Sequence, residues 1–506
     1  MKIIKFLAAV TGALAIILTS LSVWTTRNFG DVSIDQAVWH IFHSRLTGMN
    51  PDYVVRGIKY LASTTAYILL WLSIVYLNHY LISAVKIGCK LLKQTLLRLK
   101  QAAKASPPPT SKAVNVLLLI LGVSGCCLVA ADVNRKFKIS DYVKYSYLTE
   151  TTDFIQAHYH VPAPEDIRFE KQNNLVIVSV ESLENSFAHK ALDQSYIPNL
   201  AQLRQHSARH PCLLTLTGTS WTIGAFTGHF FGLPLKTPAG IEGNSYRDER
   251  GFLPGALSIF DILKSNGYET VLVIGTDSSF QSKDQLFPQH GAFRILDRKY
   301  FESAGWSLEE HGGTGWGFSD EFVLKRAAEE YTHLQKAGKP FVLFVETVDT
   351  HSPDGYCPAE LKKYHDIRDA ILNSDRNLGE FSKLFTEQDG LVYVVLGDHL
   401  FMGNPDFLAP VEQRTIYNIF HGNLPEIPAV KQQGKVSALD IAPTLLWCAG
   451  ARWGKNSEQF GLGINLFSET PSLLEQYGEA EFNKLLLQKS ALYSRFYESP
   501  DRENAF

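Results

Sequence analysis

The sequence has little cysteine, and its six cysteines include no CxxC pair and no spacing that suits a structural zinc site. They are Cys89, Cys126, Cys127, Cys212, Cys357 and Cys448. The first three fall in an apolar N-terminal region, so at most one disulfide can form in the remainder without using a thiol of that region. The fold must therefore be stable without a disulfide framework.

The sequence also lacks an excess of either charge, because 48 lysines and arginines face 51 aspartates and glutamates, for a net charge of -3. Without a basic field, the composition argues against nucleic acid as a partner. There is no internal repeat and no low-complexity tract beyond the three prolines at 107–109. At 506 residues the chain is long enough for at least two structural units.

Long apolar runs are present, and all of them lie near the N-terminus. Residues 6–24, 60–85 and 113–131 are each long enough to cross a hydrocarbon core of about 30 Å. The first run also suits a cleaved signal peptide, but no clear small-x-small cleavage site follows it and two further runs appear. The simplest interpretation is three transmembrane helices within a membrane region over residues 1–132.

The loop between the second and third runs carries seven basic residues and no acidic one among them. They are Lys86, Lys90, Lys93, Arg98, Lys100, Lys104 and Lys112. Such a loop is expected on the cytoplasmic side, which places residues 25–57 and everything after Asp132 outside. The alternative is that this basic segment forms an amphipathic surface helix of a soluble protein. Residues 133–172 are polar and mixed, and are predicted to form a juxtamembrane connector.

From residue 173 onward, short apolar runs alternate with helical patterns. The runs at 175–180, 271–274, 341–345 and 391–396 are candidate strands, and residues 256–265 and 322–335 have helical periodicity. This alternation predicts an α/β fold with a central, mostly parallel sheet and helices on both faces. Residues 173–506 are therefore expected to form one extracytoplasmic domain.

Acidic residues and histidines follow three of the candidate strands. Glu181 follows the first strand, Asp349 and His351 follow the third, and Asp398 and His399 follow the fourth. Because ligands collect at the carboxyl ends of parallel strands, this pattern indicates a divalent cation site. Each position alone also has an ordinary explanation: a carboxylate in a first helical turn, a turn aspartate beside a surface histidine, or a loop histidine.

A run dense in hydroxyls and glycines occupies residues 216–229 and precedes an apolar stretch. Small residues let backbone N–H groups approach an anion at a helix start, and a hydroxyl there becomes a nucleophile if a metal lowers its pKa. Four hydroxyls compete for that role, and spacing does not choose among them; a helix N-cap is the structural alternative. They are Thr217, Thr219, Ser220 and Thr222.

Taken together, these segments resemble the alkaline-phosphatase and sulfatase superfamily, in the branch that holds lipoteichoic acid synthases and the phosphoglycerol transferases of membrane glucans. The resemblance covers roughly residues 173 to 470. It is carried by the segments 176–184, 221–224, 280–284, 315–321, 350–353, 396–399 and 440–446. The sulfatase signature Cys-x-Pro-x-Arg is absent, because Leu-Leu-Thr follows Cys212, which argues against hydrolysis of sulfate esters.

The resemblance implies a sulfatase-like, alkaline-phosphatase-type domain with a single divalent ion, often manganese, with magnesium or zinc as alternatives. Its ligands would be Glu181, Thr222, Asp398 and His399, with Thr222 as the nucleophile. The context of Thr222 is closer to the glucan phosphoglycerol transferases than to the lipoteichoic acid enzymes. The phosphate or glycerol of the substrate would be contacted by His351, Lys283 and Trp316.

The activity that this family pattern implies is transfer of glycerol phosphate from phosphatidylglycerol through a covalent phospho-threonine intermediate. The acceptor is left open between a glycan and a polyglycerol-phosphate chain. The enzyme would be a multi-pass protein of a bacterial cytoplasmic membrane, with its catalytic domain in the periplasm or outside the cell. The membrane spans would hold the site near its lipid donor.

Other activities fit the same residues. Phosphoethanolamine transfer uses the same superfamily site on a different lipid, and a phosphodiesterase or phosphatase would release the head group to water. A non-catalytic membrane scaffold is the alternative from a different class, although a scaffold has no need for a complete metal site. Dependence on an acceptor and metal content would separate these alternatives.

Overall fold

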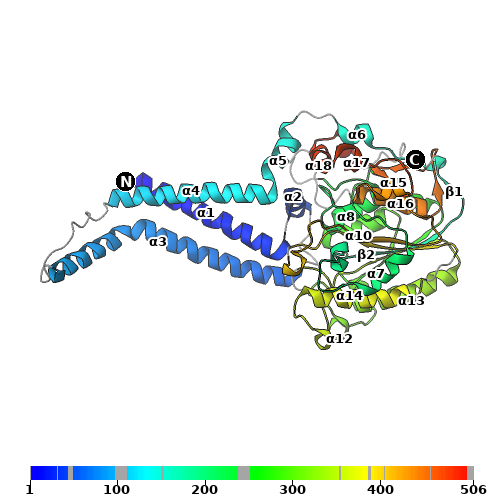
Figure 1. The fold of residues 1–506 in the computed structure, drawn as a ribbon, viewed down its shortest axis with the longest axis horizontal. Helices are drawn as coiled ribbons and strands as arrows, with labels where there is room; N and C mark the ends of the chain where they lie inside the picture. The colour runs from blue at the N-terminus through cyan, green and yellow to red at the C-terminus, as the bar shows by residue number, and fades with distance from the viewer. Residues whose placement is uncertain are drawn as a thin grey trace. The chain divides into compact units, whose positions relative to one another are not determined.

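The computed structural model describes residues 2–30, 32–43, 50–96, 111–149, 153–236, 251–352, 355–385, 389–403, 405–455 and 457–498. The chain divides into two compact units (Figure 1). The first consists of Met1–Asn28 and Pro51–Ile139, and the second of Phe29–Asn50 and Ser140–Phe506. Residues 29–50, predicted from the sequence to lie within a membrane region over 1–132, are thus grouped with the larger unit.

The smaller unit is built from three long helices, α1 (Lys2–Phe29), α3 (Pro51–Leu96) and α4 (Ser111–Phe137). Each contains a stretch long and apolar enough to cross a membrane: Lys2–Phe29, Pro51–Asn78 and Lys112–Phe137. The prediction of three such helices is confirmed. Much of the predicted basic loop, and the three prolines, lie outside the described residues. Between α3 and α4, the buried amide of Asn78 donates to the Asn115 amide oxygen at 2.6 Å.

The larger unit is organised around a six-stranded sheet in the order β5-β4-β6-β2-β7-β8. All neighbouring strands are parallel except β7 and β8. The strands are β2 (Asn174–Val180), β4 (Glu269–Ile274), β5 (Arg294–Leu296), β6 (Phe341–Glu346), β7 (Leu391–Gly397) and β8 (Asn418–Gly422). The predicted α/β class with a mostly parallel central sheet is confirmed, and the four candidate strands correspond to β2, β4, β6 and β7.

Apolar side chains cover both faces of this sheet. In β2, Leu175 and Ile177 belong to one core, whereas Val176 and Val178 belong to the other. Because successive side chains of a strand point to opposite faces, a strand buried on both sides becomes a continuous apolar run. The first core includes residues of α8 (Thr222–Phe231), α9 (Ile259–Ser265), α10 (Lys283–Gln289) and α16 (Ile441–Cys448); the second includes residues of α7 (Pro198–Leu203), α13 (Asp320–Ala337) and α14 (Ile367–Ser382).

The remaining elements of the larger unit are short. The helices are α2 (Ile34–His43), α5 (Ile139–Val143), α6 (Phe154–His158), α11 (Arg298–Ser303), α12 (Leu308–His311), α15 (Ala429–Gln432), α17 (Leu473–Tyr477), α18 (Glu479–Leu487) and α19 (Ala491–Arg495). Short strands pair β1 (Arg168–Phe169) with β10 (Ala451–Arg452), β3 (Leu213–Leu214) with β9 (Val436–Ser437), and β11 (Gln459–Phe460) with β12 (Gly463–Ile464).

A buried histidine near the end of α8 makes stability sensitive to acid. His229 is 1% exposed, and its Nε2 has no hydrogen-bond partner among the described residues. Burial lowers the pKa of His229 to about 3. Between that value and the ordinary pKa near 6.5, the unfolded chain takes up a proton that the folded chain does not, so stability falls as pH falls.

We therefore expect His229→Phe to reduce the loss of stability between pH 7 and pH 5, an effect of up to about 2 kcal/mol for one proton. The measurement is the midpoint of thermal unfolding, followed by tryptophan fluorescence at several pH values. The exposed His333→Phe variant is the control and should keep the wild-type slope. An unchanged slope in His229→Phe would contradict the assignment of a neutral buried imidazole.

Candidate metal centre and nucleophile

Two adjacent parallel strands, β2 and β7, deliver Glu181, Asp398 and His399 to one edge of the sheet. β2 lies between β6 and β7, and Val180 pairs with Gly397 in the parallel register. Glu181 and Asp398 therefore leave the sheet side by side. Because the carboxyl ends of parallel strands meet at one edge, the topology explains how residues more than two hundred positions apart come together.

Glu181, Asp398 and His399 form a compact buried group. Their ligand atoms all lie within 4.8 Å of one another, and the three residues are 4%, 1% and 1% exposed. The Nε2 atom of His399 lies 3.5 Å from Glu181 Oε1 and 3.4 Å from Asp398 Oδ2. Two carboxylates and an imidazole packed this closely away from water need either a shared proton or a cation.

Neighbouring groups hold these side chains in orientation. His399 Nδ1 lies 2.8 Å from the Leu400 carbonyl, and Asp398 Oδ1 accepts from the backbone N–H groups of Ser182 and His399, each at 2.8 Å. The Ser182 hydroxyl donates to Glu181 Oε1 at 2.5 Å. Ser182 has φ of 56°, a left-handed conformation that is uncommon for a residue with a side chain and is typical of functional sites.

The electrostatics of the group favour a bound cation. Burial, with the nearby Glu181 charge adding to it, raises the pKa of Asp398 to about 7. Although burial alone lowers the pKa of His399, Asp398 and Glu181 raise it above its ordinary value. The Glu181 charge thus destabilises the Asp398 carboxylate, and both acidic groups favour positive charge on the imidazole.

The donor set fits a divalent metal ion. His399 Nε2 has no hydrogen-bond partner among the described residues, while Nδ1 faces the Leu400 carbonyl. A proton on Nδ1 leaves the Nε2 lone pair facing the carboxylates, which is the tautomer that a metal-ligating histidine adopts. Oxygen and imidazole donors together suit manganese or zinc, and the residues do not distinguish between them.

Two of the four candidate nucleophiles, Thr222 and Thr219, differ in their surroundings. Thr222 is the first residue of α8 and is 8% exposed, and the following backbone N–H, from Ile223, donates to the Gln281 amide oxygen at 3.2 Å. Thr219 is fully buried and its hydroxyl is used within its own turn, donating to the Leu216 carbonyl and accepting from the Leu216 N–H. Thr219 is therefore a structural hydroxyl, whereas Thr222 stands at a helix start, where an anion is stabilised.

The loop before α10 reaches this helix start in a strained conformation. Gln281 and Ser282 are consecutive non-glycine residues with φ of 58° and 59°. Such conformations cost about 1–3 kcal/mol each and persist only where surrounding contacts impose them. The bond from the Ile223 N–H to Gln281 is one such contact. The loop therefore satisfies one of the N–H groups that a helix start leaves without an intrahelical partner.

The residues predicted to contact substrate fall into two groups. Trp316 and His351 are neighbours, with ring centroids 5.0 Å apart. The ring centroids of Phe280 and Trp316 are 4.9 Å apart. Lys283 is 2% exposed, and its amino group is engaged with Glu346 Oε1 at 2.6 Å. Burial raises the pKa of Glu346; the Lys283 charge opposes that shift and the Glu181 charge adds to it.

A second pair of buried carboxyls lies beside the loop that carries His351. Asp349 Oδ2 accepts from the Asp320 N–H at 2.9 Å, and Asp320 Oδ1 accepts from the Val348 and Asp349 N–H groups. Burial raises the pKa of Asp320 to about 7, and burial together with the Asp320 charge raises the pKa of Asp349 well above its ordinary value. Asp349 is not part of the group formed by Glu181, Asp398 and His399, and its carboxylate instead binds the backbone of Asp320.

The segment before α3 also contributes to the site. Asp35, on α2, accepts a hydrogen bond from the Gly218 N–H at 2.9 Å, close to the start of α8. Burial raises the pKa of Asp35, an effect that its hydrogen bonds oppose. Trp39 and His40 lie near Trp221, each with a ring-centroid distance of 6.5 Å. No local signal in residues 29–50 pointed to these contacts, because they connect positions almost two hundred residues apart.

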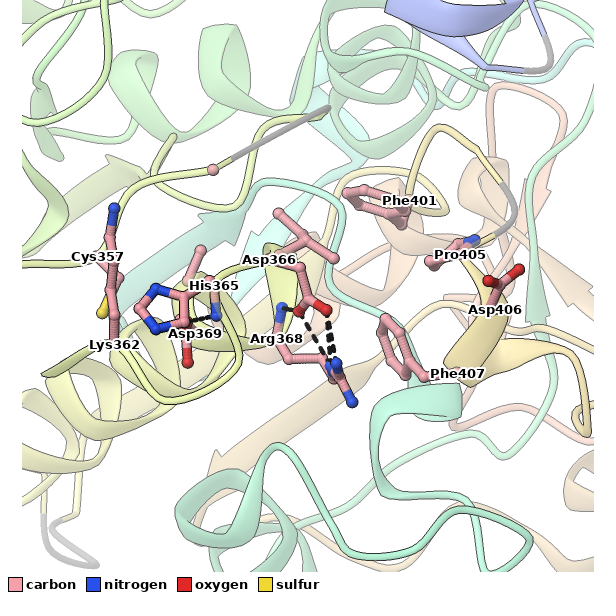
Figure 2. Close-up of a pocket in the computed structure, with 13 residues that line it drawn as sticks. Cys357, Lys362, His365, Asp366, Arg368, Asp369, Phe401, Pro405, Asp406 and Phe407 are labelled. Carbon is pink, nitrogen blue, oxygen red and sulfur yellow. Dashed lines mark hydrogen bonds and ion pairs between the residues drawn. The ribbon is translucent and has the colours of Figure 1, made fainter. Parts of the chain in front are cut away.

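A pocket is lined in part by residues of the chain segments that follow β6 and β7 (Figure 2). Its volume is about 720 Å³, and Phe401, two residues after His399, and Gly355, four residues after His351, line it. The Ser352 hydroxyl donates to the Met402 carbonyl at 2.9 Å and so joins the two loops. A pocket of this size is typical of small-molecule sites.

Comparison with known proteins places the chain in a family. A family model described as Sulfatase matches residues 173–451, more than half of the chain. The chain therefore belongs to the sulfatase family. This match, with the relatives given next, confirms the resemblance predicted from the sequence motifs.

Two curated relatives are both named phosphoglycerol transferase I. Phosphoglycerol transferase I of Xanthomonas campestris pv. campestris strain B100 is 30% identical over 376 residues, which are 72% of this chain and 52% of the relative. Phosphoglycerol transferase I of Escherichia coli O6:K15:H31 strain 536 is 29% identical over 346 residues, 65% of this chain and 43% of that protein. The chain thus spans about half the length of the curated relatives it matches.

Among solved structures, similarity extends to a lipoteichoic acid synthase from Listeria monocytogenes, with 20% identity and a TM-score of 0.46. The match covers 67% of this chain and 81% of that one. A Vibrio parahaemolyticus protein of the alkaline phosphatase superfamily has 22% identity and a TM-score of 0.49, covering 65% of this chain and 81% of that one.

Proposed function

We propose that this protein is a membrane-anchored phosphoglycerol transferase that moves glycerol phosphate from phosphatidylglycerol to a glycan outside the cytoplasmic membrane. The observation that carries the proposal is the buried group of Glu181, Asp398 and His399, set at the edge of the sheet in a chain 30% identical to a phosphoglycerol transferase I. Three helices of membrane-spanning length support a lipid donor, because they hold the site at the bilayer.

The candidate site residues would have different roles: some would bind the cation or the substrate, and Thr222 would form the bond to phosphorus. Glu181, Asp398 and His399, with Thr222 as the fourth ligand in the family pattern, would hold a divalent cation. When bound, that ion lowers the pKa of a coordinated hydroxyl and offsets charge on phosphate oxygens. His351 and Trp316 lie together and would contact the phosphate or glycerol, while Lys283 would act as part of a buried pair with Glu346.

The reaction would proceed in two balanced steps. The Thr222 oxygen forms a bond to phosphorus and releases its proton, while the bond from phosphorus to the diacylglycerol oxygen breaks and that oxygen takes up a proton. The glycerophosphoryl group is then carried on Thr222. In the second step an acceptor hydroxyl loses its proton and bonds to phosphorus, and Thr222 regains its hydroxyl.

The pocket lined by Phe401 and Phe407 supports a neutral acceptor. Its wall combines the aromatic rings of Phe401 and Phe407 with two cationic and three anionic side chains (Figure 2). Arg368 is neutralised by Asp366, with Nη2 to Oδ2 at 2.6 Å, and lies 4.2 Å from the centroid of the Tyr364 ring. A polyglycerol-phosphate chain is anionic and would need an excess of positive charge, whereas fixed polar groups of both signs suit hydroxyls, which donate and accept.

The test uses the full chain in detergent with manganese and phosphatidylglycerol labelled in its head group. We expect diacylglycerol release and transfer of label to a neutral glucan oligosaccharide, with no turnover of phosphatidylethanolamine. Phe407→Ala should raise the KM for the glucan about tenfold, because it removes an apolar contact, and should leave labelling of the enzyme unchanged. The exposed Leu384→Ala variant serves as the control.

Other results would redirect the assignment. Turnover of phosphatidylethanolamine alone would indicate phosphoethanolamine transfer, and label released only to water would indicate a hydrolase. Transfer to polyglycerol phosphate but not to the glucan would contradict the acceptor proposed here. No turnover of either lipid together with no bound metal would support a scaffold.

A further inference from the structure

The helix α2 lies between two candidate membrane spans in the sequence, yet it packs into the core of the catalytic unit. Trp39 is 3% exposed and belongs to the same apolar core as residues of α8. Residues 29–50 are grouped with the larger unit rather than with α1 and α3, which flank them in the chain. A segment that only connects two membrane spans needs no buried tryptophan. The burial of Trp39 in the catalytic unit therefore indicates a further role for α2.

One contact from α2 ends on the turn that precedes the nucleophile helix. Asp35 Oδ2 accepts from the Gly218 N–H at 2.9 Å. Gly218 has φ of +79°, a left-handed conformation that glycine adopts without strain. A Cβ added at Gly224 would lie only 2.7 Å from the Gly218 carbonyl oxygen, so this turn rests directly on the first turn of α8. Displacement of Gly218 would therefore be transmitted to the start of α8.

A second contact from α2 reaches the residue next to Thr222. The rings of Trp39 and Trp221 lie 6.5 Å apart, tilted by 45°, and Trp221 is 1% exposed. Trp221 is the N-cap residue of α8, so its backbone sets the direction in which Thr222 begins the helix. Two contacts of different kinds, one hydrogen bond and one aromatic pair, thus converge on the start of α8.

We propose that α2 is a positioning element of the active site, in which Asp35 and Trp39 hold the turn before Thr222 and so orient its hydroxyl. The inference rests on the proposed role of Thr222 as the nucleophile. Catalytic geometry tolerates little displacement, and a shift of about 1 Å in a supporting contact can cost roughly a hundredfold in rate. The outer segment between the first two spans is therefore part of the enzyme and more than a connection.

The test compares Asp35→Ala with Asp35→Asn in the full chain. The asparagine oxygen still accepts from the Gly218 N–H, whereas alanine leaves that group without its partner. We expect Asp35→Ala to slow labelling of Thr222 by about tenfold without changing the KM for phosphatidylglycerol, and Asp35→Asn to restore most of the rate. Trp39→Ala and Trp39→Phe form a second pair with the same expected order. The matched control is Asp389→Ala, at an exposed aspartate away from the site.

Hydrogen exchange of the peptide containing Gly218 reports the contact itself, independently of turnover. Faster exchange there in Asp35→Ala than in Asp35→Asn, with an unchanged midpoint of thermal unfolding, supports the positioning role. Equal labelling rates in all four variants would overturn it, as would equal loss in Asp35→Ala and Asp35→Asn. If the wild-type chain forms no adduct, the proposed function fails, and the exchange difference still decides whether α2 holds the turn.

Discussion

Replacing Thr222 by alanine is expected to abolish both diacylglycerol release and labelling of the protein, with a loss of at least about a thousandfold in turnover. Thr222 supplies the only atom that becomes bonded to phosphorus in the proposed first step, so no residual covalent route remains. Thr222→Ser keeps a hydroxyl at the start of α8 and should retain measurable labelling, now on serine. The measurement is intact-protein mass spectrometry after incubation with phosphatidylglycerol, followed by peptide mapping.

A matched control lies one and a half turns further along the same helix. The Thr227 hydroxyl is buried and donates to the Ile223 carbonyl at 2.8 Å, so Thr227→Val changes a threonine of α8 without touching its first residue. It should keep wild-type labelling. An adduct that persists in Thr222→Ala would mean that another hydroxyl of the run, Thr217 or Ser220, is the nucleophile. Loss of labelling in Thr227→Val as well would point to general damage to α8.

The inner strands of the sheet were predictable because they are buried on both faces. Such strands consist of continuous apolar residues, and β2, β4, β6 and β7 all have this pattern. The two edge strands were missed for physical reasons. β5 contains only three residues, and β8 begins with Asn418 and ends in His421 and Gly422, so neither produces an apolar run long enough to stand out.

The meeting of Glu181, Asp398 and His399 at one edge of the sheet was predictable because topology alone brings the ends of parallel strands together. Glu181 and Asp398 directly follow a strand, and His399 comes next after Asp398, so a sequence pattern records these positions. The groups that support them were not predictable in the same way. Asp320 begins a helix, and nothing near it in the sequence indicates that its carboxyl lies against the backbone of Asp349. Lys283 was recognised from a motif, but its buried partner Glu346 was not.

Contacts between distant segments account for most of what the sequence did not reveal. The bond from the Gly218 N–H to Asp35 joins residues 183 positions apart. Neither residue is unusual locally, since a glycine before a helix and an aspartate in a first helical turn are both common. Only the fold shows that the Asp35 carboxylate accepts a hydrogen bond from a backbone N–H in the turn before α8.

Removal of the metal is expected to destabilise the catalytic unit as well as to stop turnover. Without a cation, the carboxylates of Glu181 and Asp398 remain buried beside the lone pair of His399, and their mutual repulsion opposes folding. An ion present at a hundred times its dissociation constant stabilises the folded state by about 2.7 kcal/mol. We therefore expect chelation to lower the midpoint of thermal unfolding and added manganese to restore it.

His399→Ala should lower metal affinity by at least about a hundredfold, because it removes a nitrogen ligand outright, whereas loss of a supporting partner alone costs about 10–100-fold. Metal content by mass spectrometry and the shift of the unfolding midpoint on adding manganese are the measurements. The control is His421→Ala. His421 lies in β8, which carries none of the three candidate ligands, and its Nδ1 atom is 3.2 Å from the Ser207 hydroxyl. That variant should bind metal as the wild type does. A chelator that leaves both the unfolding midpoint and turnover unchanged would show that the three buried ligands hold a shared proton, and the reaction would then need another source of positive charge at phosphorus.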